Sequence, residues 1–318
     1  MNRFQILALD GGGLKGLFSA AVLAQLETDL KINIVDHFDL IAGTSTGGIV
    51  ALGLSIGMRP KEIVAFYSEH GPRIFPHANR PHWVRRIRGP RYNPAPLRAA
   101  LRDVFGDRLL ADAQKRLVIP SYDIGENAVH LFRTPHSSRL NRDFRVSMVD
   151  IALATTAAPT YLPAHRLGHS RLIDGGVWAN NPTMVAVTEA GGELRLPLSS
   201  VRVLSLGTTS ETKAPSAGLD RGGLIAWGKA GAGVFLDGQA LTAYNQAYHL
   251  LGASNILRIN PLVPEGQFRL DLVHDSALLS KAAKASRDNS PAVAERFADH
   301  VAPEYLPYRT STEVNANA

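Results

Sequence analysis

Hydrophobic positions along the chain fall into two kinds of segment. Short, almost wholly apolar runs are typical of strands buried on both faces of a sheet, and longer segments with apolar residues at helical spacing lie between them. Strands are predicted at residues 4–9, 38–42, 116–123, 128–133, 171–173 and 201–208. Helices are predicted at residues 17–30, 49–57, 61–69, 97–105, 149–158, 182–190, 236–251 and 275–285. This alternation indicates an α/β protein with a central sheet flanked by helices.

Two segments interrupt the pattern. Several prolines between residues 71 and 98 argue against regular structure there. Glycine, serine, alanine and lysine are frequent in residues 209–233, which predicts a mobile loop or lid that includes Trp227. We expect a single domain over residues 4–308, because the candidate motifs lie on both sides of the predicted strands, and a disordered polar tail over residues 309–318.

A serine stands where one predicted strand meets the next helix, in Gly43-Thr44-Ser45-Thr46-Gly47. On such a strand-to-helix turn, a nucleophile elbow, the serine backbone is strained and the hydroxyl projects from the end of the sheet. Gly43 and Gly47 lack the Cβ atoms that would block the turn or an approaching substrate. The pattern indicates a nucleophilic Ser45. The alternative is a glycine-rich turn whose serine caps the helix.

The first predicted strand ends in a second glycine-rich loop, Asp10-Gly11-Gly12-Gly13-Leu14-Lys15-Gly16. Consecutive glycines at the start of a helix expose backbone amides that suit an anion. Adjacent strands would bring this loop and the serine turn to one edge of the sheet. We therefore expect the amides of Gly11, Gly12 and Gly13 to form an oxyanion hole.

The same glycines permit another interpretation. Gly11, Gly13 and Gly16 fit the G-x-G-x-x-G spacing of dinucleotide-binding loops. That motif requires an acidic residue at the end of the second strand, about 20 residues further on. Asp36 is at that distance, but the predicted strand continues past it and ends in the serine turn.

An aspartate ends a later predicted strand. Asp174 precedes Gly175 and Gly176, which would let another segment approach closely. Aspartate before glycine is usually part of a turn. The functional alternative is a general base that accepts the proton of Ser45 as it attacks an ester carbonyl. With a reference pKa of about 3.9, an aspartate is effective in this role only when it is desolvated and hydrogen-bonded to the hydroxyl.

Composition excludes several kinds of chemistry. The chain has no cysteine, which rules out disulfides, thiolate metal sites and cysteine catalysis. No apolar run reaches the roughly 18 residues of a membrane span, and the N-terminal residues lack the pattern of a signal peptide. We expect a cytoplasmic protein that touches the inner membrane only peripherally.

The net charge is +6, mostly from arginine, and it favours anionic partners. Several arginines share the proline-rich segment with Trp83 and Tyr92: Arg80, Arg85, Arg86, Arg88 and Arg91. Arginine and aromatic side chains together suit a lipid interface, or a cyclic nucleotide held by stacking and phosphate pairing. A solvated basic loop explains the segment equally well. Nucleic acid is not expected as a partner.

Taken together, a series of motifs resembles the patatin-like phospholipase family in order and spacing. They are the Asp10 to Gly16 loop, the Ser45 turn, Ala157-Ala158-Pro159-Thr160-Tyr161, Asp174-Gly175-Gly176 with Asn180-Asn181-Pro182, and Leu204-Ser205-Leu206-Gly207-Thr208. They cover residues 4–208, whereas residues 209–308 match no motif of the family. The resemblance implies a three-layer fold with a mixed sheet between helices. It also implies a Ser-Asp dyad, with Ser45 as nucleophile and Asp174 as base, and neither a cofactor nor a metal.

The resemblance further implies hydrolysis of phospholipid acyl esters through an acyl-enzyme. The chain is similar to bacterial patatin-like effectors of anti-phage defence, which degrade membrane phospholipid when a cyclic dinucleotide binds. Other interpretations are an unregulated esterase and a non-catalytic nucleotide-binding module built on residues 11–16. A Ser-His-Asp triad that uses His249, His274 or His300 is the competing site chemistry.

Overall fold

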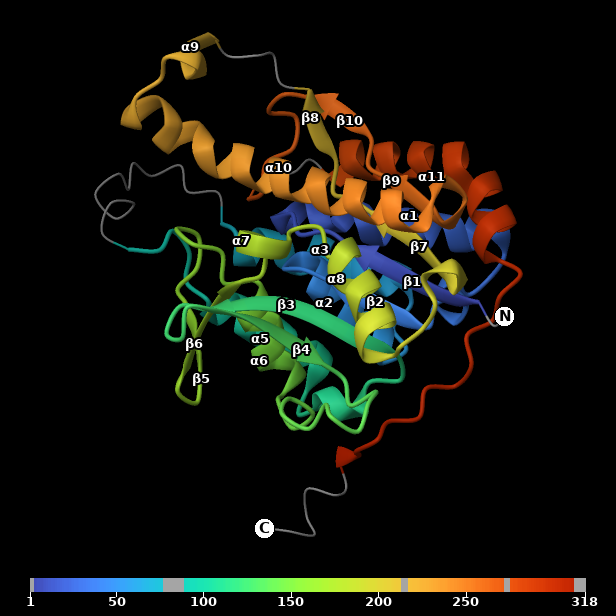
Figure 1. Ribbon diagram of the computed structural model, residues 1–318. Coiled ribbons are helices and arrows are strands. Elements are labelled where there is room, and N and C mark those ends of the chain that lie inside the picture. Colours follow the sequence, from blue (N-terminus) through green and yellow to red (C-terminus); the bar gives the residue numbers. More distant parts are fainter. Residues whose placement is uncertain (1–2, 77–88, 213–216, 272–274, 312–318) are drawn as a thin grey trace.

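The computed structural model describes residues 3–76, 89–212, 217–271 and 275–311 (Figure 1). Its main sheet has the strand order β5-β6-β3-β2-β1-β7-β9, with β4 also paired to β3. The strands are β1 (Phe4–Leu9), β2 (Leu40–Gly43), β3 (Arg116–Asp123), β4 (Ala128–Arg133), β5 (His165–Leu167), β6 (Ser170–Asp174), β7 (Val201–Leu206) and β9 (Ile256–Ile259). A separate small sheet pairs β8 (Ser210–Thr212) with β10 (Leu262–Pro264).

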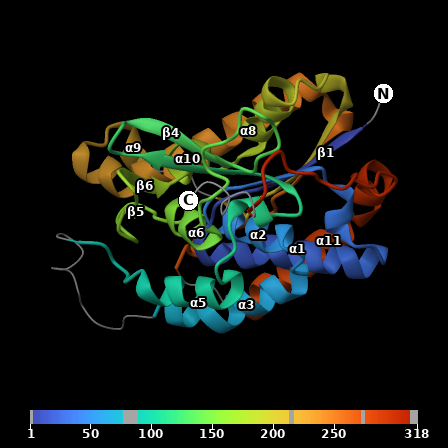
Figure 2. The same ribbon diagram turned by 90° about the horizontal axis from the view of Figure 1, so that it is seen from below.

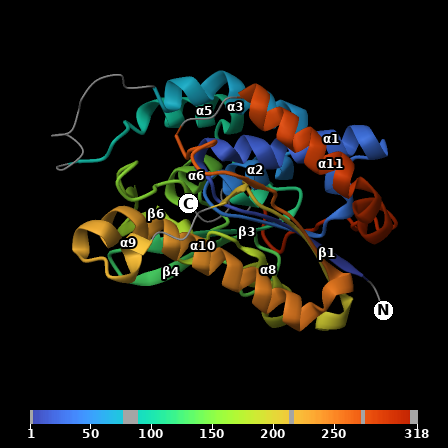
Figure 3. The same cartoon turned by 90° about the horizontal axis from the view of Figure 1, so that it is seen from above.

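Helices cover both faces of the main sheet (Figures 2 and 3). One face carries α1 (Gly16–Leu30), α2 (Thr46–Ser55), α3 (Pro60–Ile74), α5 (Ala95–Phe105), α6 (Met148–Thr155) and α11 (Asp275–Phe297). The other face carries α8 (Thr183–Thr188) and α10 (Leu224–Leu251). The described residues also form two short helices, α7 (Gly176–Ala179) and α9 (Ala217–Asp220). The result is a three-layer α/β fold.

Strand β1 shows why the central strands are largely apolar. Successive side chains of a strand point to opposite faces. Leu7 and Leu9 enter the larger core, beneath α1 and α11, whereas Ile6 and Ala8 enter the smaller core, beneath α8 and α10. Every residue of β1 is therefore buried, including the polar Gln5, whose Nε2 donates to the carbonyls of His37 and Phe297.

The register of the sheet brings several strand ends to one edge. β1 pairs in parallel with β2 and β7, and Leu9 lies opposite both Gly43 and Leu206. β3 is parallel to β2 but continues beyond its end, and the antiparallel β6 pairs with this extension, so Asp174 lies opposite Ser121. An antiparallel strand thus delivers its last residue to the same edge as the parallel strands.

One prediction failed where proline was taken as a helix breaker, and a second helix is longer than predicted. α3 continues through Pro72 to Ile74, because Pro72 lies in the last turn and removes a hydrogen bond only near the helix end. α11 extends past residue 285 through Pro291 to Phe297. The segment between 71 and 98 is therefore helical at both of its ends, since α5 begins at Ala95.

The predicted loop at residues 209–233 is wrong in its second half. β8, α9 and the start of α10 occupy the described part of this segment. Gly231 lies inside α10, and the space where its Cβ would stand is flanked by the rings of Trp227 and Phe235 at 3.8 and 3.6 Å. Gly231 by itself disfavours a helix, but it packs between aromatic side chains one turn before and one turn after it. The chain after residue 209 also supplies β9 to the main sheet and α11 to the larger core.

Candidate active site

Ser45 links β2 to α2 in a strained conformation. Its φ of 55° and ψ of −123° lie in a region that residues with a Cβ rarely adopt, at a cost of about 1–3 kcal/mol. The turn is tight enough that a Cβ on Gly43 would lie 2.2 Å from the carbonyl oxygen of Gly47, and one on Gly47 would lie 2.3 Å from that of Leu9. Both glycines are therefore required by the geometry of the turn.

The helix α6 holds this turn in place. The Ser45 amide donates to Thr155 Oγ1 at 2.9 Å, and Thr155 Oγ1 donates to the carbonyl of Pro120 at 2.6 Å. Ser147 caps α6 in turn, with Asp150 N donating to Ser147 Oγ at 3.0 Å. The Ser45 side chain makes no capping bond to α2. The structure therefore contradicts the interpretation of Ser45 as a helix cap.

The Ser45 hydroxyl instead points at Asp174. Ser45 Oγ donates to Asp174 Oδ2 at 2.6 Å, and the Gly176 amide donates to Asp174 Oδ1 at 2.7 Å. Burial raises the pKa of Asp174 to about 6, although the hydrogen bonds from Ser45 and Gly176 oppose the rise. A Cβ on Gly175 would lie 2.3 Å from the carbonyl oxygen of Pro120, so the chain after Asp174 needs glycine there. The carboxylate is thus positioned, buried and more basic than usual.

The glycine loop lies beside the serine. A Cβ on Gly11 would come within 3.2 Å of Ser45 Cβ. The Gly11 amide donates to the Asn180 carbonyl at 2.9 Å, so the expectation that it is free for an oxyanion is wrong. The amides of Gly12 and Gly13 have no acceptor among the described residues. They are the loop amides available to a developing negative charge.

A salt bridge at the root of this loop was not anticipated from the sequence. Arg258, on β9, donates from Nη2 to Asp10 Oδ2 at 2.6 Å and from Nη1 to Asp10 Oδ1 at 3.1 Å. It also donates to Ser205 Oγ at 2.7 Å and stacks against the ring of Tyr244 on α10 at 5.7 Å. Burial raises the pKa of Asp10, and the Arg258 charge acts against that rise. A charged residue in the apolar run of β9 was the only signal in the sequence.

The structure describes one of the five arginines singled out in the basic segment. Arg80, Arg85, Arg86 and Arg88 lie outside the described residues. Arg91 forms an ion pair with Asp271, which also accepts a 2.8 Å hydrogen bond from the Tyr92 hydroxyl. The Asp271 carboxylate is buried. Arg91 therefore ties this segment to the C-terminal part of the chain rather than standing free for an anion.

The alternative site chemistries do not match the geometry. Asp36 lies in a turn before β2, whereas a dinucleotide site needs an acid at the other end of that strand. His300 Nε2 contacts Asp39 Oδ2 at 2.7 Å, again before β2 and at the edge opposite Ser45. His249 packs against Tyr248 on α10, and His274 lies outside the described residues. Within the described chain, no histidine contacts Ser45 or Asp174.

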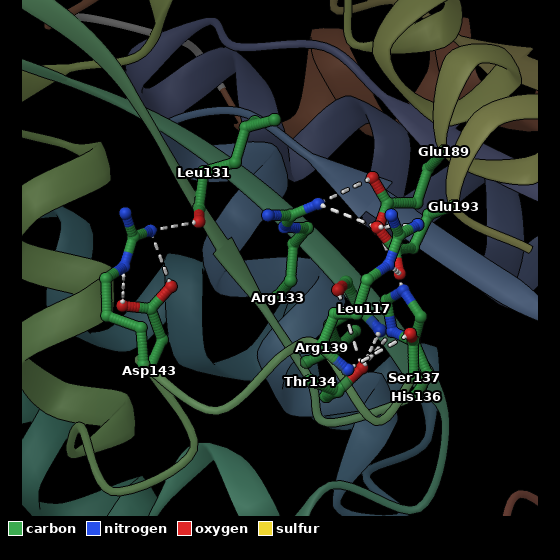
Figure 4. Close-up of polar contacts among 11 residues, drawn as sticks. Leu117, Leu131, Arg133, Thr134, His136, Ser137, Arg139, Asp143, Glu189 and Glu193 are labelled. Carbon is green, nitrogen blue, oxygen red and sulfur yellow. Dashed lines mark hydrogen bonds and ion pairs between the residues drawn. The ribbon is translucent and has the colours of Figure 1, made fainter.

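A second cluster of charges lies near the end of β4 (Figure 4). The buried Glu189 contacts His136 Nε2 at 2.9 Å and Arg133 Nη1 at 3.4 Å. Arg133 pairs in register with Val118, toward the end of β3 that is far from Ser121. Because the charges of this cluster pair with one another, we assign it to the anchoring of β4 against α8.

The comparisons with known proteins decide the family. A family model described as patatin-like phospholipase matches residues 7–187, more than half of the chain. The chain belongs to the patatin-like phospholipase family. The sequence resemblance is thereby confirmed, and this membership makes the protein a lipid acyl hydrolase. Ser45 lies within the matched residues, as does Asp174, whereas Arg258 and all of α10 lie beyond them.

Several characterised proteins are similar to this patatin-like chain. A Pseudomonas aeruginosa protein named cGAMP-activated phospholipase is 38% identical over 239 residues, which cover 73% of this chain and 70% of that protein. A Vibrio cholerae protein of the same name is 33% identical over 252 residues, covering 71% of each. Among solved structures, VipD from Legionella pneumophila matches with a TM-score of 0.50 at 13% identity, over 93% of this chain and 67% of VipD. This last similarity concerns the fold alone.

Proposed function

We propose that this protein hydrolyses phospholipid acyl esters, with Ser45 as nucleophile and Asp174 as general base. The observation that carries the proposal is the 2.6 Å hydrogen bond from Ser45 Oγ to the buried Asp174 carboxylate. The strained turn projects the hydroxyl from the sheet edge, and the Gly12 and Gly13 amides lie in the adjacent loop. Nucleophile, base and anion-stabilising groups are thus supplied by the ends of three strands of one sheet, β2, β6 and β1.

The reaction proceeds in two halves. Ser45 Oγ attacks the ester carbonyl carbon while its proton passes to Asp174, and the tetrahedral oxyanion is held by the loop amides. The carbon–oxygen bond to the lysophospholipid breaks, and Asp174 returns the proton to that leaving oxygen. Water then attacks the acyl-enzyme with Asp174 again accepting a proton. The bond between the acyl carbon and Ser45 Oγ breaks, Asp174 returns the proton to Ser45 Oγ, and the fatty acid leaves.

The pH dependence of hydrolysis follows from the raised pKa of Asp174. Its carboxylate must be ionised to accept a proton, and burial raises the pKa to about 6. We expect kcat/KM for a soluble ester to fall about tenfold for each pH unit below that value and to level off above it. A rate profile that measures this should show a single acidic limb. If kcat/KM instead fell only below about pH 4, the Asp174 carboxylate would not be desolvated during turnover.

We further propose that a cyclic dinucleotide activates the enzyme, in the manner that the names of the Pseudomonas and Vibrio relatives state for those proteins. A ligand that binds the folded protein raises its melting temperature, by an amount that grows with concentration. We expect cGAMP to raise the melting temperature of this chain in a panel that includes cyclic di-GMP, cyclic di-AMP and the linear dinucleotides. If no dinucleotide raised the melting temperature, the result would favour an unregulated acyl hydrolase.

The proposed substrate lies in a membrane, so the enzyme must meet one. No helix of the described residues combines the length and apolar character needed to cross a bilayer. We propose that the protein acts from the cytoplasm and binds the inner membrane peripherally.

A further inference from the structure

Helix α10 has an unusual outer surface for a helix exposed to water. It is 28 residues long, and apart from Lys229 and Asp237 its sequence contains no acidic residue, lysine or arginine. Large apolar side chains on it are exposed: Trp227 is 39%, Val234 40%, Phe235 71% and Leu241 61% exposed. We call these four residues the outer face of α10. An exposed helix normally turns charged residues to the solvent.

The inner face of the same helix is already used. Ala247 and Leu251 are buried in the smaller core, against β7 and β9. The helix therefore has apolar side chains on both sides. The outer face is a second apolar surface, distinct from the side that packs against the sheet. Contiguous exposed apolar side chains of this kind mark a surface that binds something less polar than water.

Helix α10, which carries the outer face, lies next to the candidate active site. Gln239 Oε1, in the middle of α10, accepts a 2.7 Å hydrogen bond from the Asn180 amide. The Asn180 carbonyl in turn accepts the 2.9 Å bond from the Gly11 amide, in the loop beside Ser45. The N-terminal half of α10, which carries all of the outer face except Leu241, projects past α7 at that edge of the molecule (Figure 1).

A second copy of the chain fits this surface poorly. Trp227, Val234 and Leu241 recur every seven residues, as in one position of a coiled coil. The other seam positions are Gly231 and Gly238, which supply no side chain to fill a partner's holes. A Cβ on Gly238 would meet nothing within 4 Å. Binding to a bilayer does not require interlocking side chains. Tryptophan and phenylalanine are well suited to the interfacial region of a bilayer.

We propose that the outer face of α10 inserts into the interfacial region of a phospholipid bilayer and holds the Ser45 edge of the sheet against it. The inference rests on the proposed function, since it is the phospholipid substrate that requires the site to face a membrane. It gives residues beyond the matched family region a definite role. The net charge of +6 favours binding to an anionic membrane surface. The apolar contact determines how the protein is oriented on that surface.

The test compares a variant of the outer face with a matched control. Phe235→Ser/Leu241→Ser removes the two most exposed side chains of the face. The control, Val301→Ser/Leu306→Ser, removes side chains that are 70% and 73% exposed on the segment after α11. That segment lies by the far edge of the sheet, where the neighbouring Ala302 amide bonds to the Asp36 carbonyl. Both pairs lose similar exposed apolar surface at opposite edges.

Binding is measured by co-sedimentation with vesicles of ether-linked phosphatidylethanolamine and phosphatidylglycerol, which have no acyl ester to cut, with and without cGAMP. Each large side chain withdrawn from the lipid weakens partition by roughly tenfold or more. We expect the outer-face variant to lose at least that much binding, while the control binds as wild type. Equal binding by the two variants, or no binding by the wild type in either condition, would overturn the inference.

Hydrolysis of a short-chain ester in solution separates this inference from the proposed function. The outer-face variant should hydrolyse the soluble ester at the wild-type rate and vesicles of ordinary phospholipid at least tenfold more slowly. If the wild type binds vesicles through α10 but hydrolyses neither substrate, the membrane-binding surface is supported and the proposed chemistry is rejected. Light scattering measures the oligomeric state of both proteins. If the wild type is a dimer and the Phe235→Ser/Leu241→Ser variant is a monomer, the outer face is a contact between copies of the chain.

Discussion

Asp174→Asn is expected to remove most of the hydrolytic activity while making the folded protein more stable at neutral pH. Asparagine keeps an oxygen for the Gly176 amide and a polar group for Ser45, but it cannot accept the serine proton. Loss of a general base lowers the rate by about 10²–10⁴-fold. We expect a loss of that size in kcat/KM for a soluble ester, with the protein folded.

The stability gain follows from the direction of the pKa change. Asp174 has its pKa raised from 3.8 to about 6 by burial, so the folded chain holds the proton more tightly than the unfolded chain. The stability linked to this group is complete below pH 3.8 and is lost as the pH rises through about 6. Asparagine has no charge to bury, so the variant should gain on the order of 2–3 kcal/mol above pH 6.

Thermal melts of wild type and Asp174→Asn across pH 4–8 measure this gain, which should vanish at the acidic end. Asp123→Asn is the matched control, since Asp123 is also a buried aspartate at the end of a strand. Burial raises the pKa of Asp123, but hydrogen bonds from Ser170 and from backbone amides, including that of Gly125, bring it below the usual value. Its replacement should destabilise the protein at neutral pH. An Asp174→Asn protein that melts lower than wild type at pH 8 would contradict the account of a desolvated base.

Arg258→Met is expected to lower kcat by about 10²-fold with little change in KM, the effect of a catalytic group displaced by roughly 1 Å. Asp10 is buried directly before the glycine loop, and Arg258 satisfies both of its oxygens. Methionine would leave this carboxylate without its cation, at a cost to folding of about 3–5 kcal/mol. The carboxylate would then shift or take up a proton, and the Gly12 and Gly13 amides would move with it.

The double variant Asp10→Asn/Arg258→Met distinguishes positioning from general loss of stability. Removing both partners leaves no buried charge, so the double variant should recover stability relative to Arg258→Met. Arg258→Lys keeps a cation but not the two-pronged contact, and we expect an intermediate kcat. Kinetics on the folded fraction at several pH values provide the measurement. An Arg258→Met enzyme with wild-type kcat would show that the salt bridge does not hold the loop.

The parts of the site that sequence could predict are those specified by local backbone geometry. Gly43 and Gly47 are needed because the turn leaves no space for Cβ atoms, and Gly175 is needed where the chain passes Pro120. Such requirements leave a trace within a few residues of Ser45 and Asp174. The buried strands could be predicted for a similar reason, since both faces of β1 must be apolar.

Long-range pairings left no comparable trace. The partner of Asp10 is Arg258, 248 residues away, and neither residue signals the other in the sequence. The Gly11 amide is engaged by Asn180, a contact made by folding rather than by the loop itself. Helix α10 was predicted to begin too late, because its glycines were weighed by intrinsic propensity while the rings that flank Gly231 belong to the tertiary structure.

Fatty-acid release from mixed phospholipid liposomes, followed by mass spectrometry, tests the central claim most directly. The assay compares wild type with Ser45→Ala, each with and without the cyclic dinucleotide panel. We predict that wild type releases fatty acid and lysophospholipid, that cGAMP increases this release, and that Ser45→Ala releases neither product under any condition. Equal release by wild type and Ser45→Ala would contradict the assignment of Ser45 as the nucleophile.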